Sequence, residues 1–170
     1  MKKRILALLL AVCVACSMLI LPASASGSNT AVQTAVTLGG LTSDQTANLA
    51  APLTRGALTK LMVAFSAYRE SAKTQGSTGT LFSDVGSGSA YAPYVRIAVQ
   101  QGWISGYTDG TFRPEQYITR AETVTMINRM LGRNYETATE LHSMACPFPD
   151  VSQSNWAYGN IMEAAITHKH

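Results

Sequence analysis

The stretch Gly106-Tyr-Thr-Asp-Gly-Thr-Phe-Arg-Pro114, followed closely by Ile118-Thr-Arg-Ala-Glu122, carries the strongest structural signals in this chain. In its first part, Asp109-Gly110 supplies the positive-φ position that a short turn needs, and Phe112 is placed to anchor that turn. Pro114 stops the turn from continuing as a strand or a helix. The first part therefore predicts a tight turn held by an aromatic side chain.

The second part predicts the start of a helix. Thr119 is a good N-cap residue, and Glu122 stands at the spacing of a capping box. Arg120 lies between them in the first helical turn, where the helix dipole disfavours positive charge. Because a helix N-terminus offers free N–H groups and a guanidinium is a forked donor, we expect Arg120 to bind an anion. The alternative is a capping box beside a solvated arginine, and for Glu122 we favour that structural role.

The first 25 residues have the pattern of an export signal. Residues 1–4 form a basic segment with Lys2, Lys3 and Arg4, residues 5–21 form an apolar run, and Ala23-Ser24-Ala25 fits the small-x-small rule for cleavage. An uncleaved membrane anchor is the alternative, but the apolar run is at the short limit for spanning a bilayer. We therefore expect a secreted protein whose mature chain begins near Ser26 and is not held in the membrane.

Cleavage changes the charge and the cysteine content. Ten basic residues would remain against ten acidic ones, so the overall charge of +3 gives no argument for nucleic-acid binding. Cys146 would be the only cysteine left, which excludes an intramolecular disulfide or a thiolate metal cluster. The histidines lack metal-ligand spacing, Asp109 alone is too few oxygen ligands for calcium, and no nucleophile stands beside a base. The sequence thus predicts no metal, no cofactor and no enzyme.

Two pairs of motifs recur at nearly one period. Leu53-Thr-Arg-Gly-Ala57 resembles Ile118-Thr-Arg-Ala-Glu122 at an offset of 65, and Phe82-Ser-Asp-Val85 resembles Phe148-Pro-Asp-Val151 at an offset of 66. Such self-similarity indicates a repeat protein whose units pack on one another. The predicted fold class is mainly α, with helix-loop-helix repeats forming a bundle.

The parts of one repeat follow from local signals. Thr54 should cap a helix whose apolar face repeats at helical spacing, and Asp84 should cap or brace a turn after a polar loop at residues 71–80. A second helix should run from about Tyr91 to Gln101 and end at Gly102. The apolar face of the first helix comprises Leu58, Leu61, Met62 and Phe65.

The chain holds about two repeats' worth of these parts. Residues 26–51, rich in Ser, Thr, Ala, Gly and Gln, have the composition of a linker, so ordered structure should begin at Pro52. The division that follows is a signal peptide (1–25), a linker (26–51), a partial first repeat (52–80), a complete repeat (81–133) and a truncated repeat (134–170).

These motifs together resemble the S-layer homology family. The resemblance spans about residues 52 to 170 and is densest from Phe82 to Gly132. It implies a non-catalytic, carbohydrate-binding module that attaches exported proteins to the bacterial cell wall or S-layer through secondary cell-wall polysaccharide, often at a pyruvylated sugar. It also implies a pseudo-threefold arrangement of three repeats, and it makes Arg120, and Arg55 in a more degenerate motif, the ligand contacts.

The candidate ligand-binding residues gather at the Thr-Arg helix starts and at the turn. They are Thr54, Arg55, Trp103, Gly106, Tyr107, Asp109, Gly110, Thr119, Arg120 and Glu122. Tyr107, Trp103 and Trp156 are candidates for stacking on sugar rings, although packing is the default interpretation for Trp156. An alternative function also stays open, in which the incomplete repeats self-associate or assemble with other S-layer homology chains.

Overall fold

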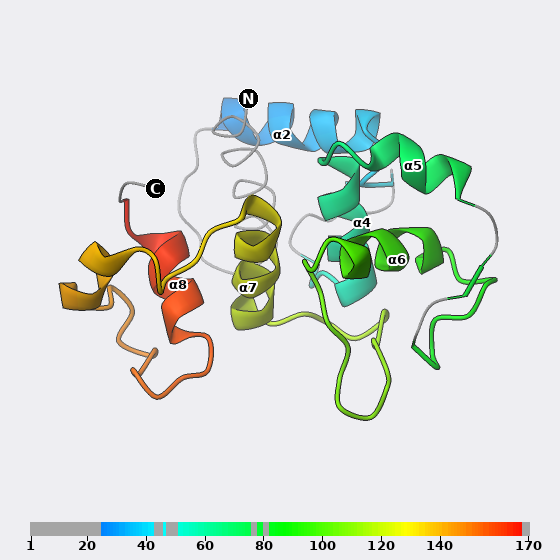
Figure 1. The fold of residues 1–170 in the computed structure, drawn as a ribbon. Coiled ribbons are helices and arrows are strands. Elements are labelled where there is room, and N and C mark those ends of the chain that lie inside the picture. The colour runs from blue at the N-terminus through cyan, green and yellow to red at the C-terminus, as the bar shows by residue number, and fades with distance from the viewer. Residues whose placement is uncertain (1–24, 43–45, 47–50, 76–77, 80–81, 168–170) are drawn as a thin grey trace. The chain divides into compact units, whose positions relative to one another are not determined.

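The computed structural model describes residues 25–42, 46, 51–75, 78–79 and 82–167 (Figure 1). Across these residues the chain is helical and forms no strand, apart from an isolated antiparallel bridge between Thr54 and Tyr117. The predicted mainly α fold class is therefore confirmed. The predicted signal peptide covers residues 1–25, of which residues 1–24 lie outside the described residues. In the part of the chain that is described, no helix combines the length and the apolar character needed to cross a membrane.

The chain divides into two compact units, Met1–Ile118 and Thr119–His170. In each unit a Thr-Arg helix packs against the helix that follows the next Phe-x-Asp-Val element: α4 against α6, and α7 against α8. The first unit contains α2 (Ala25–Thr37), α4 (Arg55–Ala64), α5 (Arg69–Thr74) and α6 (Ala92–Gln100). The second unit contains α7 (Arg120–Leu131), a 3₁₀ turn, η1 (Thr139–Ser143), and α8 (Tyr158–Ala165).

Helix α4 forms where the sequence predicts it. The Thr54 hydroxyl accepts a hydrogen bond from the Ala57 amide at 3.2 Å, which satisfies one of the free donors of the first turn. Its apolar stripe faces the core, and Leu58, Leu61 and Met62 are completely buried. Because burying a side chain of this size contributes roughly 1.5–3 kcal/mol, this face is the main attachment of α4 to the first unit.

Helix α6 also agrees with its prediction. Pro93 stands in its first turn, where a missing N–H costs nothing, and Gly102 follows its end with φ of 70°. Val95 and Ala98 are buried against the first unit's core. The helix therefore leads the chain directly into the turn that begins at Gly106.

The expectation that order begins only at Pro52 is wrong. Helix α2 occupies half of the segment interpreted as a linker, and it buries Ala31 and Ala35. Two small residues spaced four apart make a narrow apolar stripe, which the surrounding Ser, Thr and Gly residues obscure in the sequence. The predicted polar loop at residues 71–80 needs a similar correction, because α5 extends through Thr74 and buries Ala72.

The second unit has a small core of its own. Val151, Ala157 and Ile161 form one buried cluster of this unit, and partly buried side chains of α7, of α8 and of the loop before Val151 pack around them. A partly buried polar contact joins α7 and α8, because the Asn128 side-chain amide donates to the carbonyl of Asn160 at 2.8 Å. The segment from Phe148 onward therefore completes the packing of α7.

Candidate functional site

The turn from Gly106 to Pro114 has the predicted conformation. The Tyr107 amide donates to the Thr111 carbonyl at 2.8 Å, and Gly110 takes φ of 77° between them. Gly106 is required for a different reason: a Cβ there would lie 2.2 Å from the Phe82 ring. The turn is therefore closed by its own backbone and pressed against the Phe-x-Asp-Val element.

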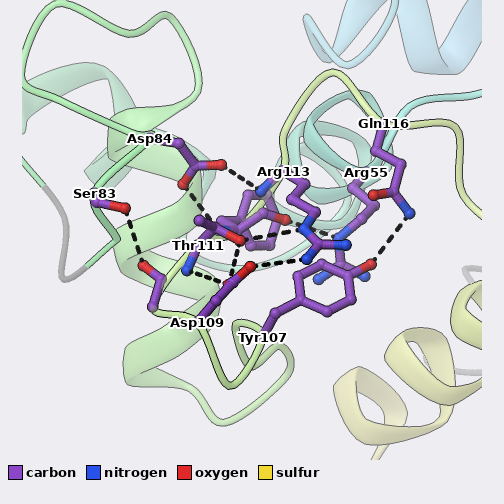
Figure 2. A network of polar contacts seen from close by, with 10 residues as sticks. Arg55, Ser83, Asp84, Tyr107, Asp109, Thr111, Arg113 and Gln116 are labelled. Atoms are coloured by element: carbon purple, nitrogen blue, oxygen red, sulfur yellow. Dashed lines mark hydrogen bonds and ion pairs between the residues drawn. The ribbon is translucent and has the colours of Figure 1, made fainter.

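Arg55 reaches into this turn from the first residue of α4 (Figure 2). Its Nε donates to the Phe112 carbonyl at 3.0 Å, and its Nη2 donates to the Ser105 carbonyl at 3.2 Å. Its guanidinium carbon also lies 4.8 Å from the centroids of both the Tyr107 and the Phe112 rings. With only 6% of the residue exposed, Arg55 is committed to the turn and is not presented to solvent.

Asp84 holds the turn through a second set of backbone groups. Its two carboxylate oxygens accept hydrogen bonds from the amides of Phe112, at 2.8 Å, and Arg113, at 2.6 Å. The Phe82 ring stacks on the Phe112 ring with centroids 5.5 Å apart. The sequence predicts that Asp84 caps or braces a turn just after the polar loop, whereas the structure shows it bracing the later Gly106–Pro114 turn. A cation thus binds carbonyls in and next to this turn, and an anion binds its amides.

The backbone after the turn covers the start of α4. The Arg55 amide donates to Gln116 at 2.9 Å, and the Gly56 amide donates to Pro114 at 2.8 Å. These are two of the donors that a helix N-terminus leaves without intrahelical partners. Because the chain itself occupies them, the N-terminus of α4 has lost the amides that would bind an anion.

Arg113 belongs to the same network, although the motifs of the sequence do not single it out. Its Nη2 pairs with Asp109 at 2.8 Å, and its guanidinium carbon lies 4.0 Å from the Tyr107 centroid. Its backbone is left-handed, with φ of 59°, which is uncommon outside glycine. Tyr107 thus contacts two guanidinium groups, and Gln116 donates to its hydroxyl at 3.3 Å. The sequence signal that could have identified Arg113 is its position four residues after Asp109, the spacing of the ion pair that the two form.

The Asp109 carboxylate is held in its ionised form. Hydrogen bonds from the Thr111 hydroxyl, from Arg113 and from the Thr111 amide lower the pKa of Asp109 from 3.8 to about 2. The same pairing with Asp109 raises the pKa of Arg113. Since the folded pKa lies below the unfolded one, the ionised carboxylate stabilises the turn above pH ~3.9, and this contribution disappears as the pH falls toward 2.

An NMR titration of the Asp109 carboxyl carbon should therefore show a midpoint near pH 2. Thr111→Val removes the hydroxyl that is the largest cause of the shift, so it should raise the midpoint toward the ordinary value for aspartate. Arg113→Gln should raise it as well. A midpoint near 4 in the unmutated chain would contradict the geometry of this turn.

The start of α7 matches its prediction closely. The Thr119 hydroxyl accepts from the Glu122 amide at 3.2 Å, and Glu122 accepts in return from the Thr119 amide at 3.0 Å, so the capping box is confirmed. The Arg120 side chain is 40% exposed, and its Nη2 lies 3.6 Å from Asp150. Its guanidinium carbon lies 4.6 Å from the Phe148 ring centroid. The repeat offset from Phe82 and Asp84 was the signal that could have identified these two neighbours.

The two tryptophans differ in exposure, and Trp156 is placed opposite to expectation. Trp103, a candidate for sugar stacking, is buried, and its ring packs edge-on against Tyr68 with centroids 5.9 Å apart. Trp156, for which packing was the default interpretation, is 67% exposed. That interpretation was wrong because Ala157, its neighbour, takes the buried position before α8. An exposed indole at this place is free to stack on a flat partner.

The predicted site residues thus fall into two groups. The first unit brings together Thr54, Arg55, Gly106, Tyr107, Asp109 and Gly110 around one turn. The second unit brings together Thr119, Arg120 and Glu122 at the start of α7. Among the residues that the structure describes, no three acidic, histidine or cysteine side chains gather as a metal site would need.

Comparison with known proteins identifies the region that contains the turn. The family model for the S-layer homology domain matches residues 81–124. Cell surface glycoprotein 1 of Acetivibrio thermocellus is 48% identical over 77 residues, which are 45% of this chain and 3% of that protein. A cellulosome-anchoring protein of the same organism is 42% identical over 77 residues, 45% of this chain and 16% of that protein.

A cell surface protein of Thermoanaerobacter kivui is 39% identical over 83 residues, 48% of this chain and 11% of that protein. The chain therefore spans only a small part of the curated relatives that it matches. No solved structure matches the chain. The matched residues hold the Phe-x-Asp-Val element, α6, the turn and the first residues of α7. Residues 81–124 of this chain therefore match the S-layer homology domain, and this region is similar to segments of bacterial cell-surface proteins.

Proposed function

We propose that this chain is a non-catalytic module that anchors a secreted protein at the cell surface by binding secondary cell-wall polysaccharide. The names of its relatives support the coarser part of this proposal, since they include a cell surface glycoprotein and a cellulosome-anchoring protein. A pyruvylated sugar of that polysaccharide is the ligand that suits the chemistry of the Thr-Arg helix start.

The exposure of Arg120 carries the proposal. The chain has two arginines at Thr-Arg helix starts, and Arg55 is buried in its turn while the Arg120 side chain is 40% exposed. A ketal-linked pyruvate presents a carboxylate, which a guanidinium binds with two parallel hydrogen bonds. The neighbouring pair with Asp150 is long, at 3.6 Å, and both side chains are exposed, so a ligand carboxylate can replace it at little cost.

Arg120→Ala should weaken binding to purified cell-wall polysaccharide by about 1.5–3 kcal/mol, the range for hydrogen bonds to a charged group. Folding should change little, because the side chain is half exposed and does not belong to the buried cluster of the second unit. Binding is measured by co-sedimentation with sacculi, before and after chemical removal of pyruvate. Arg129→Ala is the matched control, since Arg129 is an exposed arginine in the last turn of the same helix.

The unmutated chain should prefer the native polysaccharide, and Arg120→Ala should lose that preference while Arg129→Ala retains it. Equal binding of both sacculus preparations by the unmutated chain would exclude the pyruvate carboxylate as the ligand. Binding of Arg120→Ala as tight as that of the unmutated chain would exclude Arg120 as the contact.

A further inference from the structure

The two Thr-Arg arginines have equivalent neighbours in different states. In the first unit the turn lies between the cation and the anion: Arg55 donates to the Phe112 carbonyl in the turn and to the Ser105 carbonyl just before it, and Asp84 accepts from two turn amides. The Phe112 ring of the turn also lies 4.8 Å from the guanidinium carbon of Arg55 and stacks on the Phe82 ring, with the two centroids 5.5 Å apart. Arg55, Phe82 and Asp84 thus form a receptor that is filled by the turn.

The repeat offsets place Arg120, Phe148 and Asp150 at the same three positions in the second unit, and we call them the Arg120 face. Here the cation and the anion meet each other directly, with Arg120 3.6 Å from Asp150. Arg120 also lies directly over the Phe148 ring, at 4.6 Å. Within the described residues of the second unit, no turn lies between them, and the Asp150 side chain is 71% exposed.

We propose that the Arg120 face is a docking site for a Gly-Tyr-x-Asp-Gly-Thr-Phe-x-Pro turn supplied by another chain that carries S-layer homology repeats. The complementarity is the one seen in the first unit. A guanidinium faces turn carbonyls, a carboxylate faces turn amides, and an aromatic ring faces the turn's phenylalanine. The incoming phenylalanine replaces the contact between Arg120 and Phe148, and the turn backbone replaces the ion pair.

The energetic balance favours this exchange. The Arg120–Asp150 ion pair is long and exposed on both sides, so it contributes little to stability and opening it costs little. In return, a phenylalanine ring leaves water, as Phe112 does completely in the first unit. A second copy of this chain is a poor donor, because its own turn is already held by Arg55 and Asp84 and would have to expose Phe112.

The docking site does not depend on polysaccharide binding, although both involve Arg120. The role of Asp150 distinguishes turn docking from polysaccharide binding. A docked turn needs the Asp150 carboxylate as an acceptor for its amides, as Asp84 is in the first unit. A bound pyruvate carboxylate is repelled by it. Asp150→Asn should therefore weaken turn docking and leave binding to sacculi unchanged or tighter.

The probe is a fluorescently labelled synthetic peptide with the sequence of residues 105–116 of this chain, cyclised through its ends to hold the turn. Titration of the purified chain should give saturable anisotropy. Asp150→Asn and Arg120→Ala should each weaken the peptide at least tenfold, as should alanine at the peptide's phenylalanine. Asp150 is exposed, so Asp150→Asn should keep the helical circular dichroism of the unmutated chain.

Three results would overturn the proposal. One is an absence of binding at millimolar peptide. Another is binding that Asp84→Asn weakens and Asp150→Asn does not, since the peptide would then be displacing the chain's own turn. The third is a chain that dimerises on its own in sedimentation and loses the dimer in Asp150→Asn, since the occupant would then be a second copy.

Discussion

Phe112→Ala should lower the free energy of unfolding of the first unit by about 3–5 kcal/mol, the usual cost of removing a fully buried phenylalanine. Phe112 has no exposed surface, stacks on Phe82 and lies against the guanidinium of Arg55. Its removal leaves a cavity at the point where the turn, α4 and the Phe-x-Asp-Val element meet. The loss should therefore affect the whole unit and not only the turn.

The measurement is urea unfolding followed by tryptophan fluorescence in a Trp156→Phe background, so that buried Trp103 alone reports on the first unit. Phe148→Ala, at the position in the second unit that is equivalent to Phe82, is the control, and it should leave this Trp103 transition nearly unchanged because Phe148 lies outside the first unit and is only partly buried. Equal losses for the two alanine variants would mean that the Trp103 transition does not report on the packing of the turn.

Arg55→Ala should be the next most disruptive change, lowering the stability of the first unit by about 2–4 kcal/mol. Each hydrogen bond from a charged donor contributes about 1.5–3 kcal/mol, and two aromatic contacts add to them. Arg55→Lys should not restore stability, because a single ammonium cannot reach the Ser105 and Phe112 carbonyls with the geometry of the fork.

Arg120→Ala is the matched control for this experiment. It removes an arginine from the same motif, yet its side chain is 40% exposed and its ion pair is long, so the expected loss is about 0–1 kcal/mol. The same urea titration, read at 222 nm for helix content, compares the two variants. If Arg120→Ala destabilised the chain as much as Arg55→Ala, the distinction between a buried brace and an exposed contact would be lost.

Features encoded within a few residues were predictable from the sequence. The capping box of Thr119 and Glu122, the end of α6 at Gly102 and the turn at Gly110 each depend on backbone preferences of neighbouring residues. These features position the candidate site along the chain.

Features that depend on distant contacts were not predictable. Arg55 and Arg120 occupy the same motif, and only the presence of a turn over Arg55 makes it buried. The left-handed backbone of Arg113 is held by Asp84 from 29 residues away, which no local pattern records. Helix α2 depends on small apolar residues whose burial requires the rest of the first unit.

The pairing of α4 with α6, and of α7 with α8, puts the folded unit out of phase with the repeated sequence. Each repeat begins with the second half of one helical pair and ends with the first half of the next. Excising a single sequence repeat would therefore yield two helices that lack their partners, whereas a fragment cut half a period later would keep one matched pair. Inserting a whole period anywhere preserves the matching, because it adds one helix of each kind. Arrays of this type can thus lengthen or shorten by recombination without exposing an apolar face at the join.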